Sequence, residues 1–110
     1  MAEVARAEIW QFSFPTPNKR RPVVVLTRQQ IIPHLETVTV APITSTIRGI
    51  PTEVLIGPEA GLKGPSAINL DHLTTVPKAG LRAFVGVVSP DALAQIRGAL
   101  LFALGFDLDH

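Results

Sequence analysis

The 110-residue sequence contains no cysteine and no tyrosine, and aromatic side chains make up only 5% of it. The lack of cysteine excludes disulfide bonds, thiolate zinc sites and a cysteine nucleophile, and it is consistent with a reducing cytoplasm. Charge is also scarce, because charged residues form 17% of the chain and the net charge is +1. Any contact with nucleic acid must therefore come from a local cluster of cations.

Metal-ligand spacing and long apolar runs are missing too. The histidines His34, His72 and His110 are scattered, which argues against a structural metal site. The longest apolar run covers residues 99–104, far short of the roughly 20 residues that a membrane span needs. The first residues contain no apolar run of signal-peptide length. Because 46% of the residues are hydrophobic, we expect one soluble, cytoplasmic domain over residues 1–110.

What the sequence does contain is a series of short strand patterns. Residues 8–14 place Trp10, Phe12 and Phe14 on one side of a strand, and this side should face the core. Residues 22–26 are continuously apolar, which is typical of a strand buried on both faces. Further strands are expected at residues 37–43, 52–56, 66–73 and 81–88, the last with a glycine at position 86 for a bulge or close approach. Loops are expected at residues 15–18, 27–36 (with a short helix), 57–65 and 76–80.

The last part of the chain predicts a helix. Ser89 as N-cap, Pro90 in the first turn and Asp91 beside the positive helix end form a strong start. An apolar stripe follows at Leu93, Ile96, Leu100 and Leu104. So few of the helix side chains are polar that we expect a second buried side, against a partner subunit. Five to seven short strands and one C-terminal helix predict a mainly β (α+β) fold, a small barrel.

One strand end combines hydroxyl groups with a cation. Thr44, Ser45 and Thr46 lie close to Arg48, and these side chains suit an anionic, hydroxyl-bearing ligand such as a phosphodiester. The alternative is ordinary turn chemistry, since Ser and Thr favour strand ends for local backbone bonding.

The densest positive cluster is Lys19, Arg20 and Arg21, directly before the apolar run of residues 22–26. Arg21 thus lies where a loop enters a rigid strand. The alternative for this cluster is a solvated strand entry.

These segments resemble, in the same order, the MazF/PemK (Kid) family of toxin endoribonucleases from type II toxin–antitoxin systems, whose fold is shared by the gyrase poison CcdB. The matching pieces are residues 8–10, 20–26, 41–45 with 51–54, and 84–93. The resemblance spans about residues 6–105, nearly the whole chain. It implies a single MazF/PemK-like toxin domain with an SH3-like barrel, and a homodimer.

The resemblance also implies sequence-specific, metal-independent cleavage of single-stranded RNA (messenger, or ribosomal or transfer RNA) without a cofactor. A ribose 2′-OH attacks its own phosphate and leaves a 2′,3′-cyclic phosphate and a 5′-OH end. Arg21 and Thr44 occupy the positions of two catalytic residues, and donors of this kind stabilise the charge that grows on the phosphoryl oxygens. Because an arginine stays protonated, we do not assign Arg21 as the general base. Its expected roles are transition-state binding and proton donation toward the leaving oxygen. Thr44 would bind a phosphoryl oxygen.

The other candidate residues are expected to bind RNA. The cations would contact the backbone phosphates. The polar residues near position 70 would either contact base edges or pair with neighbouring side chains instead. They are Lys19, Arg20, Ser45, Thr46, Arg48, Asn69, Asp71 and His72. The histidine could also transfer a proton, or it is a surface side chain. The expected partners are the RNA, a second copy of the chain, and a cognate antitoxin whose disordered tail lies across the RNA groove.

The chain departs from the family's pattern at several positions. The loop at residues 15–20 is short and lacks the common Gly-Ser/His-Glu segment, which affects substrate gating and the choice of cleavage site. Ala7 replaces a frequent Gly, a change that a strand entry should tolerate, and His72 replaces a frequent Gln. Residues 73–75 lack an Arg that would contact a phosphate.

Two other functions are open. A CcdB-like toxin would bind a topoisomerase (gyrase), but residues 105–110 lack the Trp-Gly-Ile tail of that group, and Arg21 and Thr44 would have no chemical task. A non-catalytic barrel that binds RNA or a partner is supported mainly by the short loop. We favour the nuclease because it uses both residues.

Overall fold

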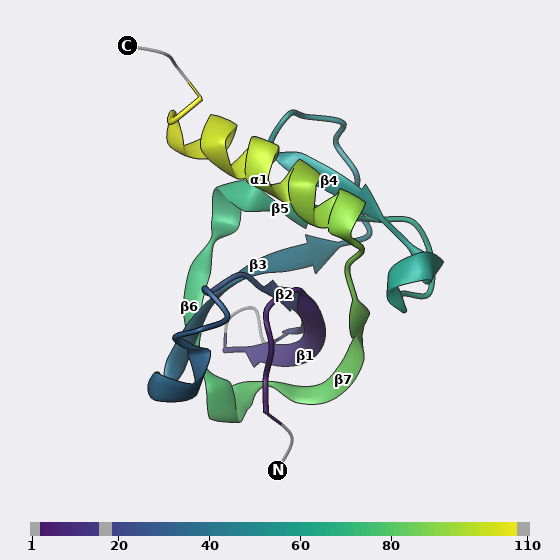
Figure 1. Cartoon of the computed structure of the whole chain (residues 1–110). Coiled ribbons are helices and arrows are strands. Elements are labelled where there is room, and N and C mark those ends of the chain that lie inside the picture. The colour runs from purple at the N-terminus through teal and green to yellow at the C-terminus, as the bar shows by residue number, and fades with distance from the viewer. Residues whose placement is uncertain (1–2, 16–18, 108–110) are drawn as a thin grey trace.

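Seven strands form one curled antiparallel sheet within residues 3–15 and 19–107, the part of the chain that the computed structural model describes. A C-terminal helix, α1 (Pro90–Leu104), crosses one side of the sheet beside β4 and β5 (Figure 1). The strands are β1 (Glu8–Phe14), β2 (Lys19–Val25), β3 (Thr37–Thr44), β4 (Glu53–Ile56), β5 (Ser66–Asn69), β6 (Thr74–Pro77) and β7 (Arg82–Val87). This half-barrel with a C-terminal helix confirms the predicted mainly β fold.

The sheet divides along β3. Its order is β4-β5-β3-β2-β1-β7, with β6 paired to β3 as well. The first half of β3 pairs with β6, up to Val40 opposite Thr74, whereas its end pairs with β5, with Thr44 opposite Ala67. The ends of β2, β3 and β5 therefore meet at one opening of the curled sheet, and this opening contains the candidate site.

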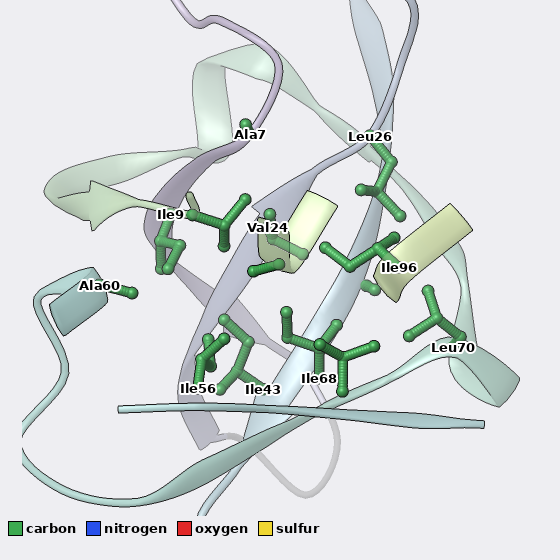
Figure 2. Packing of buried hydrophobic residues seen from close by; sticks show 14 of the residues in the cluster. Ala7, Ile9, Val24, Leu26, Ile43, Ile56, Ala60, Ile68, Leu70 and Ile96 are labelled. Atoms are coloured by element: carbon green, nitrogen blue, oxygen red, sulfur yellow. The ribbon is translucent and has the colours of Figure 1, made fainter. Parts of the chain in front are cut away.

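Buried side chains form two clusters on the two faces of β2. The first lies between the sheet and α1, where Ile96 faces side chains such as Val24 and Ile68 (Figure 2). The second contains Val23 and Val25 and lies on the opposite face. Its members are Val4, Val23, Val25, Ile32, Val38, Val40, Val76 and Leu81. The predicted burial of β2 on both faces is confirmed.

The aromatic side of β1 packs on the second cluster, as predicted. Trp10, Phe12 and Phe14 are each half-buried there. The rings of Phe12 and Phe14 meet edge to face, with their centroids 4.9 Å apart. The indole N–H of Trp10 donates a hydrogen bond to Glu8 Oε1 at 3.0 Å. The aromatic residues thus cover the core and also form part of the surface.

Helix α1 begins as its sequence predicts, because Ser89 Oγ accepts the N–H of Ala92 at 3.1 Å. Its buried residues, however, are Ala92, Ile96 and Ala99, and the two alanines allow the helix to pack closely on the sheet. The predicted stripe is wrong at its end, since Leu104 is 54% exposed. The last turn of α1 extends past the sheet (Figure 1). No helix within residues 3–15 and 19–107 has both the length and the apolar character to cross a membrane.

The strand expected at residues 66–73 is two elements and not one. β5 ends at Asn69, whose side chain accepts the N–H of Asp71 at 2.9 Å and starts the 3-10 turn η3 (Leu70–His72). The next strand, β6, begins at residue 74, where no strand was predicted. The short helix expected within residues 27–36 is η1 (Ile32–His34). Of the other expectations, residues 16–18 of the first loop and His110 lie outside the described residues.

Ala7 does not lie in an ordinary strand entry. Its φ is +77°, in the left-handed region that favours glycine, at a cost of about 1–2 kcal/mol for an L-residue. The backbone is held there by two bonds, from Ala7 N–H to the carbonyl of Val25 (2.8 Å) and from the Val88 N–H to the Ala7 carbonyl (2.9 Å). These contacts fix alanine in the conformation that a glycine would adopt more easily.

Candidate active site

β2 and β3 separate at the point where Arg21 and Thr44 lie. Their antiparallel register pairs Val23 with Pro42. If this register is continued by two residues along each strand, Arg21 lies opposite Thr44. Residues opposite each other in a sheet point to the same face, so the two side chains share a face. Both residues are half-buried and line the same two clefts. The structure therefore brings the two predicted catalytic residues together.

The first cleft has a volume of about 470 Å³ and lies at the strand opening. Most of the predicted site residues line it: Lys19, Arg21, Thr44, Thr46, Arg48, Asn69 and His72. The sequence prediction missed four further lining residues, which are Phe14, Pro42, Glu53 and Thr74. Of these, Glu53 could have been found only from the register, because it lies opposite Asn69 in the β4–β5 pair.

The second cleft has a volume of about 740 Å³ and continues from the same residues. It includes Arg20 and Ser45 of the predicted set, and it also contains side chains from residues 61–66 and from β7. The residues that line both clefts are Lys19, Arg21, Thr44 and Thr46. Arg21 and Thr44 thus lie where two recesses of the surface meet.

Asp71 lies in neither cleft. Its carboxylate accepts the hydroxyl of the buried Thr52 at 2.6 Å, and this bond joins the start of β4 to η3. Of the two roles expected for Asp71, the geometry favours pairing with a neighbour over reading a base.

The loop between β3 and β4 is held by hydrogen bonds at both ends. The Thr44 Oγ1 atom accepts the N–H of Thr46 at 3.1 Å, so its own hydrogen is left to donate to a ligand. Glu53 accepts the N–H of Arg48 at 3.1 and 3.3 Å and the N–H of Gly49 at 2.9 Å. These contacts fix the backbone that carries two cleft residues.

Asn69 determines the tautomer of His72. Its Oδ1 accepts the Asp71 N–H at 2.9 Å, so the amide nitrogen Nδ2 is the atom 3.1 Å from His72 Nδ1. Because Nδ2 is a donor, Nδ1 must accept, and the hydrogen of the neutral ring then lies on Nε2. This contact therefore assigns the Nε2–H tautomer to His72, whose side chain lines the first cleft.

Both clefts are positive. The one ion pair among the described residues joins Lys78 Nζ to Glu3 Oε1 at 3.5 Å, away from the site. Lys19, Arg21 and Arg48 share the first cleft with a single acid, Glu53. No acidic side chain lines the second cleft within the described residues. No three His, Asp or Glu side chains in this part of the chain lie close enough to hold a metal ion. Unpaired cations beside hydroxyl and amide donors make a site for a polyanion.

Comparison with known proteins identifies the class. A family model described as a PemK-like, MazF-like toxin of type II toxin–antitoxin systems matches residues 5–104. The chain belongs to this family of toxins, as its sequence resemblance predicts. Within the family it is an endoribonuclease of the MazF type.

Its relatives include mycobacterial enzymes. Endoribonuclease MazF3 of Mycobacterium tuberculosis is 45% identical over 94 residues, which cover 84% of this chain and 87% of that protein. Mycobacterium tuberculosis toxin MazF-mt6 has a similar structure, with a TM-score of 0.82 and 38% identity over 94% of this chain and 99% of that chain. An endoribonuclease from a mycobacterial species, solved in complex with its cognate antitoxin, has a TM-score of 0.87 and 27% identity over 96% of this chain and 99% of that chain.

Proposed function

We propose that this toxin cuts single-stranded RNA by the attack of a ribose 2′-OH on the adjacent phosphate. The O2′–P bond forms and the P–O5′ bond breaks. The 2′-OH proton passes to solvent water and O5′ takes up a proton, so the products carry a 2′,3′-cyclic phosphate and a 5′-OH end. No metal ion takes part. Because the attacking group is a 2′-OH, DNA is not a substrate.

The observation that carries this proposal is that Arg21 and Thr44 line the same clefts, just beyond the last β2–β3 pair, Val23 with Pro42. The guanidinium, which is always protonated, binds the phosphoryl oxygens as their charge grows and donates a hydrogen bond to the leaving O5′. The Thr44 hydroxyl donates to a phosphoryl oxygen, since its lone pair already accepts from Thr46 N–H. A hydroxyl that is oriented before the substrate arrives stabilises the transition state at little reorganisation cost.

The surrounding residues support binding of a polynucleotide. Lys19, Arg20 and Arg48 are placed to contact phosphates. The donors of Asn69 and His72 lie in the first cleft, where they can meet base edges. We assign sequence preference to this cleft for that reason.

We also propose that the toxin acts in the cytoplasm as a homodimer and is inhibited by a cognate antitoxin. Support for the dimer comes from Phe102, Leu104 and Phe106, which are 49%, 54% and 73% exposed at the end of α1. Exposed apolar side chains gathered in this way mark protein interfaces. The positive clefts suit an extended, acidic antitoxin segment, and a related mycobacterial endoribonuclease was solved with its cognate antitoxin.

The test is cleavage of a mixed single-stranded RNA in EDTA, with analysis of the ends, by wild type, Arg21→Ala and Thr44→Ala. We expect cyclic-phosphate ends from wild type and a loss of roughly 100- to 1000-fold in kcat for each variant. If wild type leaves every RNA intact, the nuclease is refuted and gyrase inhibition becomes the next assay. If both variants still cut, the class holds and this site is wrong.

A further inference from the structure

The second cleft contains cations that lie beyond the Arg21–Thr44 pair. Arg20 and Lys63 line it, and neither makes an ion pair within the described residues. Together with Lys19 and Arg21 they give the cleft four cations and no acid among its described lining residues. A polyanion that enters the site at Arg21 would find a continuous positive path here.

An aromatic ring forms part of the wall of this cleft. Phe84 is 53% exposed, although burial of such a ring is strongly favourable. It meets Trp10 edge to face, with ring centroids 5.5 Å apart and an angle of 78°. The Trp10 indole is itself held by Glu8 at 3.0 Å. Phe84 is therefore a fixed ring in a positive cleft.

The backbone of β7 is irregular on either side of this ring. In the β1–β7 register Trp10 lies opposite Phe84, and the neighbouring pairs leave Ala83 and Val85 as extra residues. Ala83 has a φ of +60°, a left-handed conformation that is unfavourable for alanine. Bulges of this kind re-aim a side chain, and here they set the direction of Phe84.

Two glycines hold the Lys63 segment against the same part of β7. A Cβ at Gly86 would overlap the carbonyl of Ala60, and one at Gly61 would overlap the carbonyl of Val85. Backbone thus packs directly on backbone between η2 (Pro58–Ala60) and β7. The cation and the ring belong to segments that are locked together.

We propose that the second cleft binds the RNA on one side of the cut phosphate, with a base stacked on Phe84 and the phosphates bound by Lys63 and Arg20. This inference rests on the proposed function. Cationic grooves with aromatic platforms are the usual means of holding single-stranded nucleic acid, and stacking accepts any base. The second cleft therefore supplies affinity, whereas the first cleft supplies the choice of sequence.

The test begins by mapping a cut site with the wild-type protein. An RNA with a single 2′-deoxynucleotide at that site then serves as an uncut ligand, alongside two shortened forms that lack the nucleotides on one side or the other. We expect Phe84→Ala and Phe84→Leu to weaken binding of the full RNA by roughly 5- to 150-fold. Each variant should match wild type on the one shortened RNA that lacks the stacked base.

Two further variants complete the experiment. Lys63→Gln should reduce the slope of log K against log salt by about 0.7, the value for one phosphate contact on a single strand. Ile31→Ala removes an apolar side chain that is 44% exposed but lies outside both clefts and outside the proposed dimer contact, and it should leave binding unchanged. The position of the cut should be the same in all variants.

Several outcomes overturn the inference. An unchanged Kd for Phe84→Ala refutes the stacking platform, and so does an equal loss on both shortened RNAs. If Phe84→Ala and Phe84→Leu lower the molecular mass in light scattering, the ring belongs to a subunit interface and the inference is wrong. Failure of wild type to cut any RNA refutes the proposed function and this inference with it. Normal cutting with unchanged binding by the variants refutes the second cleft alone.

Discussion

Replacing Glu53 by alanine should destabilise the loop between β3 and β4 rather than abolish the chemistry. Glu53 is half-buried and lines the first cleft, so it could be either a general base or a structural acceptor. Its carboxylate already accepts the N–H groups of Arg48 and Gly49, with the shortest contact at 2.9 Å. This occupied geometry favours the structural role.

The two roles differ in magnitude. Hydrogen bonds to exposed groups are partly replaced by water, so the two lost bonds should lower the free energy of unfolding by about 1–2 kcal/mol. Because Arg48 and Thr46 would then be less well fixed, we expect KM to rise by about 10-fold with a small change in kcat. Loss of a general base would instead lower kcat by roughly 100- to 10,000-fold.

Urea unfolding and steady-state cleavage distinguish the two roles, with Glu53→Gln as the matched control. The glutamine keeps an acceptor oxygen of the same reach but carries no charge and is a poor base. We expect Glu53→Gln to have intermediate stability and nearly normal kcat. A loss of kcat above 100-fold in Glu53→Gln at unchanged stability would refute the structural role.

Two further predictions concern the cleft donor and the second cleft's support. His72→Gln should keep kcat/KM within about 3-fold of wild type, because the glutamine amide N–H reaches the position of His72 Nε2. His72→Asn should lower kcat/KM by about 10-fold, because the asparagine amide reaches only the Nδ1 position beside Asn69. Equal losses of kcat/KM in the two variants would contradict the donor role. Gly86→Ala should lower the free energy of unfolding by about 1–3 kcal/mol through overlap with Ala60. The control is Gly98→Ala in α1, where the new Cβ has nothing within 4 Å and the free energy of unfolding should rise by up to about 1 kcal/mol. Urea unfolding measures both variants, and an unchanged stability of Gly86→Ala would contradict the close packing.

The sequence predicts those features that depend on local chemistry. Ser89 and Pro90 start α1 because a cap and a fixed φ act within one turn. The alternating aromatics of β1 and the apolar run of β2 predict which faces are buried. Arg21 and Thr44 were predicted from the resemblance to the family, and the structure lines the same clefts with both, while their catalytic roles stay a prediction.

Features that depend on register or on competition between side chains were missed. Glu53 enters the site because β4 places it opposite Asn69. Asp71 stays out of the clefts because its carboxylate accepts a hydrogen bond from the hydroxyl of Thr52, which is distant in sequence. Phe84 has the pattern of an ordinary strand residue, and only the bulges on either side and the packing of Gly86 reveal a ring in a positive cleft.

In the proposed reaction, the attacking group is the ribose 2′-OH beside the phosphate held by Arg21 and Thr44. The most direct measurement compares cutting of one RNA with cutting of the same RNA carrying a single 2′-deoxynucleotide at the mapped site. We expect the modified RNA to bind with an unchanged Kd and not to be cut there, while the unmodified RNA yields a 2′,3′-cyclic phosphate. Cutting of the modified RNA at the same position would show that water is the nucleophile, and it would refute attack by the 2′-OH.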